Sequence, residues 1–274
     1  MNFHSNSSNH LNYEHPYDSN LLIQKYTQSF NNTFKRDIKF IQILFPTFDI
    51  FSITFFFSLF LILIFLCLDV YFFNSQKPLY INEDILKNIG INKFYISNGY
   101  HYYKIISATF IHSNIWNLII NTYYLMNIGI IIEKNYGKLK YIILMFLCAI
   151  CGNLLTCATA KCNDIQMGIS PILSGFIGVF LQEIIMHYND VKDKLSVIGN
   201  FIFAFLSLYL MISIFPYNGN IFGNTGGLFV GISYPFIFKS DSFNNTDKKL
   251  KITFIILIIL LISATLSSII IFKC

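Results

Sequence analysis

Long apolar runs separated by short polar segments recur along the chain from residue 50 onward. Four of these runs contain few polar residues, at 50–73, 141–160, 195–215 and 252–272. With a rise of 1.5 Å per helical residue, each is long enough to cross a hydrocarbon core about 30 Å thick. Three more runs carry several polar residues, at 110–132, 169–187 and 222–238. The pattern predicts seven transmembrane helices and therefore an all-α polytopic membrane protein.

The segments outside these runs divide the chain into two parts. Residues 1–41 are polar and rich in Asn, Ser and His, which predicts a disordered or loosely folded tail ahead of a membrane domain at 42–274. Residues 75–104 join the first two runs and mix aromatic, aliphatic and polar positions, so we expect an amphipathic insertion at the membrane interface. The sixth run is short, and Pro216 and Pro235 are expected to bracket its helix.

The composition agrees with a membrane protein, and the charge distribution predicts its orientation. Hydrophobic residues make up 54% of the chain and charged residues only 12%, with a net charge of +5. Thirteen of the 19 basic residues fall in the tail and in the loops on one side of the predicted membrane domain. Because basic loops stay in the cytosol, the N-terminus is predicted to be cytosolic. This asymmetry explains the basic excess without a nucleic-acid partner.

The cysteines do not predict a metal or redox centre. Cys148 and Cys151 have the spacing of such a site, but they fall in the middle of an apolar run, so we interpret them as small packing residues. Cys162 and Cys274 are predicted to lie on the non-cytosolic side, and the sequence does not indicate whether they pair. We expect neither a metal nor a cofactor.

Ser170 is the first candidate for chemistry. It stands in the segment Gly168-Ile169-Ser170-Pro171, and no charged or carboxamide residue follows until Gln182 and Glu183. Proline suits the first turn of a helix, which predicts that Ser170 lies at a helix N-terminus. Free backbone N–H groups there bind an oxyanion. A serine in this place is also a common N-cap, and the sequence leaves both interpretations open.

Three asparagines at membrane depth are further candidates. Asn117 and Asn121 are four residues apart and so share one helix face, where they would form hydrogen bonds between helices or contribute to an oxyanion hole. Asn224 precedes Gly227 and Gly231, whose spacing is that of a close helix-packing face. Because polar groups within the bilayer need hydrogen-bond partners, Ser170 and these asparagines are predicted to lie close together.

Over about 130 positions the chain resembles the rhomboid family of intramembrane serine proteases, with matches in order at Lys104, His112, Asn121, Glu133, Gly168, Ser170, Gly227 and Gly231. The resemblance implies a six-helix core plus one C-terminal transmembrane helix, with no cofactor and with transmembrane segments of other proteins as substrates or clients. It also implies roles for individual residues: Ser170 in the nucleophile position, Gly168, Asn117 and Asn121 in oxyanion binding, and His112, Glu133, Gly227 and Gly231 in structure.

The chain departs from the family pattern where the catalytic base belongs. Asn224 occupies the position of the catalytic histidine, Ser174 that of the aromatic residue that packs on it, and Asn117 that of a second histidine. A carboxamide has no basic nitrogen. The resemblance therefore implies a protein that binds transmembrane segments and is weak or inactive as a protease. Two alternatives stay open: an active divergent protease that uses Ser170, and an unrelated seven-span transporter or receptor.

The other histidines offer no obvious base. His187 lies 17 residues beyond Ser170 on the same predicted helix, which is about 25 Å. His101 falls in the predicted insertion, and His112 is a structural residue by the resemblance. His4, His10 and His15 belong to the tail on the opposite side.

Overall fold

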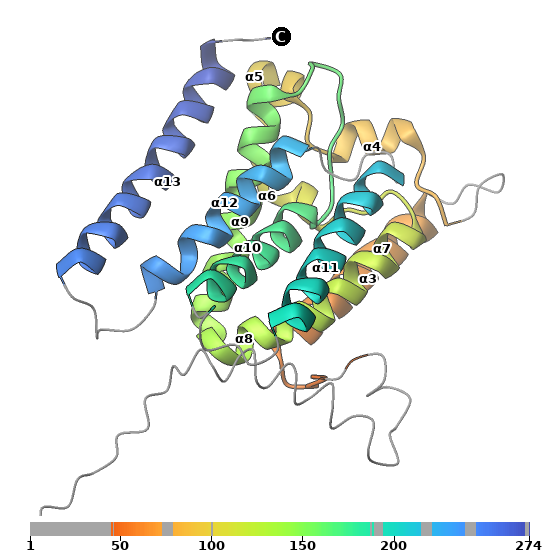
Figure 1. Ribbon diagram of the computed structural model, residues 1–274. Helices are drawn as coiled ribbons and strands as arrows, with labels where there is room; N and C mark the ends of the chain where they lie inside the picture. Colours follow the sequence, from red (N-terminus) through yellow and green to blue (C-terminus); the bar gives the residue numbers. More distant parts are fainter. Residues whose placement is uncertain are drawn as a thin grey trace, which may run out of the picture.

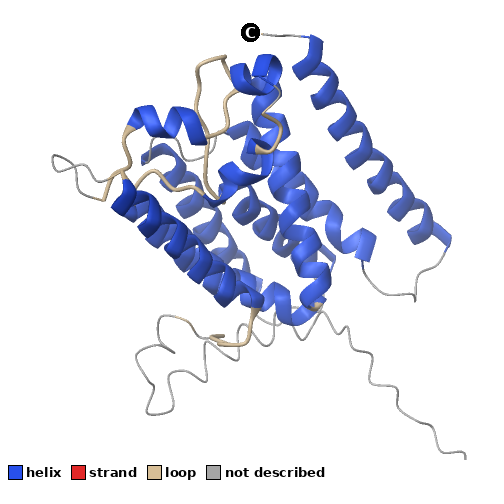
Figure 2. Ribbon diagram, turned by 180° about the vertical axis from the view of Figure 1, so that it is seen from behind, coloured by secondary structure: helices blue, strands red, loops and turns tan. Residues whose placement is uncertain are grey.

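The computed structural model describes residues 45, 47–72, 79–99, 101–186, 188, 194–214, 221–238, 245–271 and 274. Within these ranges the chain is helical, as Figure 2 shows, and two isolated β-bridges are its extended pairings. The predicted all-α fold class is confirmed. The predicted tail at 1–41 lies outside the described residues.

Each of the seven predicted spans corresponds to a helix or a run of helices. The elements are α3 (Ile53–Tyr71), α7 (Ile115–Tyr124), η2 (Leu125–Gly129), α8 (Ile130–Tyr136), α9 (Lys138–Thr159), α10 (Ser170–Met186), α11 (Lys194–Ile214), α12 (Ile221–Phe238) and α13 (Asn245–Ile271). Among the described residues, five segments are long and apolar enough to span a membrane: 53–71, 115–136, 138–159, 221–238 and 251–271. The chain is thus a multi-pass integral membrane protein.

Two predicted boundaries are wrong. The second span begins at Ile115 rather than near residue 110, because the Asn114 side chain accepts a hydrogen bond from the Asn117 backbone N–H and so caps α7. The residues before it form α6 (Lys104–Ser107) and the 3₁₀ turn η1 (Ala108–Phe110). Pro235 does not bracket α12 but lies inside it. Membrane helices tolerate proline where neighbouring groups satisfy the backbone. Pro216 lies outside the described residues.

The predicted insertion between the first two spans contains two short helices, α4 (Glu83–Ile89) and α5 (Lys93–Gly99). Leu86 and Ile96 bury their side chains, whereas Phe94 is exposed. Lys104 fastens the insertion to α6: its Nζ donates to the Asn88 carbonyl oxygen at 2.6 Å and stands 4.3 Å from the centre of the Tyr95 ring. The insertion is therefore part of the folded domain, with aromatic groups on its outer surface.

The bundle is built around α10, which packs on α12 and α9 and also contacts α7 and α11, while α9 and α12 pack directly on each other (Figure 1). α10 is buried along most of its length. α13 packs on α9, α12 and α5 at the edge of the bundle and leaves most of its surface exposed. The start of α10, where Ser170 lies, is thus enclosed by other helices.

Glycines bring α10 and α12 into backbone contact. A Cβ atom on Gly227 would overlap the Pro171 carbonyl, and one on Gly231 would overlap the Gly175 carbonyl. Any side chain larger than hydrogen would push the helices apart. These two contacts fix the register of α12 along α10.

A disulfide bond joins Cys162, in the loop after α9, to Cys274, beyond the end of α13. The sequence left this pairing open, because the two residues are 112 positions apart. The bond ties the chain beyond α13 to the end of the bundle where α9 ends and α10 begins.

The disulfide predicts which face of the membrane this end occupies. Disulfides persist in oxidising compartments, so we expect Cys162 to face the lumen or the exterior, in agreement with a cytosolic N-terminus. In sealed vesicles with the cytosolic face outward, a membrane-impermeant maleimide added with a reductant should label Cys162 only after the membrane is permeabilised, and Cys162→Ser combined with Cys274→Ser should abolish that labelling. Labelling of Cys162 in vesicles that are still sealed would contradict this orientation.

Candidate functional site

Ser170 is the first residue of α10 and is fully buried. The Ile169 carbonyl accepts the N–H groups of Ile172 and Leu173 at 2.9 and 3.1 Å. The Ser170 hydroxyl has no hydrogen-bond partner in the part of the chain that the structure describes. The N-cap interpretation is therefore not supported, because the hydroxyl caps nothing and stays free for another partner.

Gly168 shapes the approach to Ser170. Its φ of +97° lies in the region that favours glycine, and its N–H donates to the Ala108 carbonyl at 3.0 Å. This bond ties the loop before α10 to η1. A side chain at residue 168 would strain the turn that delivers Ser170 to the helix start.

Pro171 packs directly against Gly152 of α9, which has no side chain to obstruct it. A Cβ atom on Gly152 would lie 2.5 Å from the Pro171 Cβ and 2.7 Å from the Gly223 carbonyl oxygen. α9, α10 and α12 therefore meet at this point. No sequence pattern singles out Gly152, because its role depends on contacts between helices.

Asn224 is fully buried on α12, and neither atom of its carboxamide has a hydrogen-bond partner among the described residues. It lies one helical turn before Gly227, which contacts the Pro171 carbonyl. Since Pro171 follows Ser170 directly, the register supports a position for Asn224 beside Ser170. The Ser174 hydroxyl, one turn further along α10, is also buried without a described partner. The approach of the Ser170 and Asn224 side chains to within about 5 Å stays a prediction.

Asn117 and Asn121 bond to each other within α7. The Asn121 Nδ2 donates to the Asn117 Oδ1 at 2.7 Å, so this bond lies within one helix and not between helices. The Asn117 Nδ2 is buried and has no partner among the described residues. It is a free donor on a helix that contacts α10. Its arrival at Ser170 stays a prediction.

The described histidines lie outside the helix starts that carry Ser170 and Asn224. His112 is fully buried in the loop between η1 and α7. Burial lowers its pKa to about 4, so the ring is neutral at pH 7. Neither ring nitrogen has a hydrogen-bond partner among the described residues. His101 packs in the insertion against the rings of Tyr95 and Tyr103. His187 is outside the described residues.

Glu133 joins α8 to the start of α3. Its carboxylate accepts the backbone N–H groups of Ile53 and Thr54 at 2.8 and 2.9 Å, and the Thr54 hydroxyl at 2.9 Å. A carboxylate is favourable at a helix N-terminus, where N–H groups lack partners. Glu133 is 4% exposed, so it does not lie on a solvated helix face.

Glu133→Ala is expected to destabilise the fold by about 3 kcal/mol, because it leaves buried N–H and O–H donors of α3 unpaired. The loss would appear as a lower temperature at which a thiol-reactive dye reaches the buried free cysteines Cys148, Cys151 and Cys157. Lys134→Gln, on an exposed neighbour, is the matched control and should leave that temperature nearly unchanged. Equal shifts in the two variants would contradict the capping role.

The two cysteines with metal-like spacing pack in the core. Cys148 and Cys151 are buried on α9, and the Cys148 Sγ lies 3.8 Å from the Gly227 carbonyl oxygen. No group of three or more His, Cys, Asp and Glu side chains that could hold a metal occurs in the described part of the chain.

Comparison with known protein families identifies the family of this chain. The model of the rhomboid domain matches residues 100–241, more than half of the chain. The chain belongs to the rhomboid family. Rhomboids act on transmembrane substrates within the lipid bilayer. The matched region begins in the insertion and includes Ser170, Asn224 and the glycines that pack α12 on α10.

The proteins that this chain resembles include both rhomboid-like proteases and a rhomboid described as inactive. Rhomboid-like protease 1 of Toxoplasma gondii is 26% identical over 208 residues, which cover 74% of this chain and 69% of the relative. Rhomboid-like protease 3 of the same organism is 24% identical over 159 residues, covering 58% and 59%. Inactive RHOMBOID-like protein 8 of Arabidopsis thaliana is 25% identical over 138 residues, covering 50% and 38%. Since relatives described as proteases and one described as inactive both match, membership does not decide whether this rhomboid cleaves.

Proposed function

We propose that this rhomboid binds transmembrane segments of other proteins and is weak or inactive as a protease. The proposal rests on Asn224, which the resemblance aligns with the catalytic histidine, and on two backbone contacts that hold the register of α12. Gly227 against Pro171 and Gly231 against Gly175 leave no freedom to slide another side chain of α12 into that place.

The chemistry explains why the substitution matters. A serine hydroxyl is a weak nucleophile at neutral pH and needs a neighbouring base to remove its proton. A carboxamide cannot accept that proton. In soluble serine hydrolases, loss of the base or nucleophile lowers the rate by about 10⁴-fold to 10⁶-fold. Ser170 without a base would thus retain little hydrolytic activity.

Binding does not need a base. The Ser170 and Ser174 hydroxyls, the Asn117 amide nitrogen and the Asn224 carboxamide are buried with unused hydrogen-bonding capacity. Together they offer both donors and acceptors at membrane depth. A transmembrane segment that presents a peptide carbonyl and N–H to them would satisfy groups that lipid cannot. The same residues therefore support recognition after the loss of hydrolysis.

The alternative is an active divergent protease that cleaves through Ser170. Two observations favour it: the Ser170 hydroxyl is free rather than used as a cap, and relatives described as proteases match this chain. It requires an unconventional base, for which His112 and then His101 are the candidates within the described residues.

Photo-crosslinking in vesicles distinguishes the two functions. A benzophenone amino acid in place of Phe222, which is exposed at the start of α12, would capture a single-span test protein that approaches this end of the helix. The same group in place of Ile259, on the exposed face of α13, is the control. We expect adducts of intact test protein from residue 222 and no fragments. Fragments that disappear in Ser170→Ala would establish the protease alternative, and equal adducts from residue 259 would remove the binding site from α12.

A further inference from the structure

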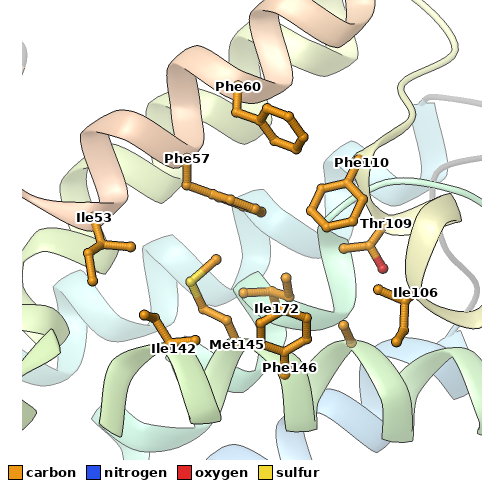
Figure 3. Close-up of a pocket in the computed structure, with 11 residues that line it drawn as sticks. Ile53, Phe57, Phe60, Ile106, Thr109, Phe110, Ile142, Met145, Phe146 and Ile172 are labelled. Atoms are coloured by element: carbon orange, nitrogen blue, oxygen red, sulfur yellow. The ribbon is translucent and has the colours of Figure 1, made fainter. Parts of the chain in front are cut away.

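An apolar cavity of about 260 Å³ lies between α3, the segment 106–110 and α9, and Ile172 of α10 also lines it (Figure 3). The one lining hydroxyl, on Thr109, already accepts a hydrogen bond from the Asn153 Nδ2 at 3.0 Å. The cavity therefore presents hydrocarbon to any occupant. Its lining comprises Ile53, Phe57, Phe60, Ile106, Thr109, Phe110, Ile142, Met145, Phe146, Ala149 and Ile172.

The cavity exists because α3 packs on α7, η2 and α8, which leaves a cleft beside α9. Figure 3 shows Phe57 and Phe60 of α3 facing Met145 and Phe146 of α9 across the cavity. Phe60 and Phe146 are each about half exposed, at 48% and 47%. In a membrane-spanning bundle such surface faces lipid, so the cleft is open to the bilayer at its side.

One end of the cleft carries positive charge. Ile53 and Ile142, at the starts of α3 and α9, line this end. Lys138 is exposed beside it, with its Nζ donating to the Phe51 carbonyl at 3.2 Å. Lys138 has no carboxylate partner among the described residues, whereas the neighbouring Lys134 faces Asp49 at 3.9 Å. Lys138 is therefore a cation available to an anionic group at the mouth of the cleft.

We propose that this cleft binds one acyl chain of an anionic phospholipid, with the phosphate of the headgroup beside Lys138. An apolar cavity of about 150 Å³ already stays dry and takes up a small hydrocarbon, so a larger one that opens to lipid is filled by acyl chain. The predicted orientation places Lys138 at the cytosolic leaflet, which holds the anionic lipids. Apolar lining and a basic mouth match the two parts of such a lipid. Binding here does not depend on whether Ser170 cleaves.

Native mass spectrometry of the purified full chain in mild detergent tests this site, with phosphatidylglycerol and phosphatidylcholine of equal chain length as the probes. We expect one tightly retained phosphatidylglycerol per wild-type chain and at least about fivefold less phosphatidylcholine. Ala149→Phe should fill the cleft and remove most of the retained lipid. Lys138→Gln keeps the cleft and should abolish the preference for phosphatidylglycerol, so the test does not depend on the folding of the Ala149 variant.

Two matched controls complete the design. Ile259→Phe adds an aromatic group to the exposed face of α13, and Lys251→Gln removes an exposed basic residue of the same helix. Both should retain the lipid as the wild type does. Equal retention of the two phospholipids by the wild type, or unchanged retention in Ala149→Phe and Lys138→Gln, would overturn the proposal. Crosslinking of the cleft to a transmembrane segment of another protein, with no lipid retained, would also overturn the proposal.

Discussion

Replacing Asn224 with His, Ser174 with Tyr and Pro171 with Gly together is expected to raise cleavage of a transmembrane substrate by about 10²-fold or more over the wild type. A positioned general base contributes about 10²-fold to 10⁴-fold. Asn224→His alone should recover little, because Ser174 leaves the new ring unsupported and Pro171 stiffens the helix start. The base must sit within about 2.6 to 3.2 Å of the serine oxygen and be held there by a third group. Fragment formation by the purified variants in vesicles measures the gain.

Two controls make this gain interpretable. The triple variant with Ser170→Ala added should return to the wild-type background. The thermal stability of each variant must also be compared, since the Pro171 ring fills space against Gly152 and its removal leaves a void. If the triple variant is stable and folded but yields no more fragments than the wild type, residue 224 is not the position where the catalytic base is missing.

Gly231→Leu is expected to prevent normal assembly of the bundle, at a cost of about 3 kcal/mol or more. A Cβ atom on Gly231 would overlap the backbone carbonyl of Gly175, and a backbone atom cannot turn aside as a flexible side chain does. α12 would have to move away from α10, which separates Asn224 from Ser170. The accessibility of the buried cysteines to a thiol-reactive dye on heating measures the loss.

Gly199→Leu on α11 is the matched control, because a Cβ atom there meets nothing within 4 Å. It should unfold near the wild-type temperature, since leucine is also a better helix former than glycine. Similar destabilisation by the two changes would show that the backbone contact of α12 with α10 does not account for the effect.

The sequence predicted the spans well because each helix must carry about 20 apolar residues to cross the bilayer. It predicted ends less well where a polar side chain intervenes. Asn114 caps α7 at Ile115, which no hydropathy pattern shows. The sequence predicts a helix boundary at Pro235, but α12 continues through it, because a membrane helix tolerates proline when its neighbours satisfy the backbone.

The candidate site could be predicted in its residues but not in its contacts. Gly227 and Gly231 gave a packing face, yet their partners on α10, Pro171 and Gly175, follow only from the assembled bundle. The disulfide between Cys162 and the distant Cys274 was beyond sequence reasoning for the same reason. Only the structure shows that the Ser170 hydroxyl is free, because a serine before proline at a helix start is ordinarily a cap.

Labelling by a serine-directed fluorophosphonate probe tests the central claim most directly. The purified wild type and Ser170→Ala would be compared in the same vesicles, with the triple variant Asn224→His, Ser174→Tyr, Pro171→Gly as the positive control. Without a base, Ser170 should react no faster in the wild type than the background set by Ser170→Ala. Strong labelling of the wild type that Ser170→Ala abolishes would contradict the account and show that another group activates this serine.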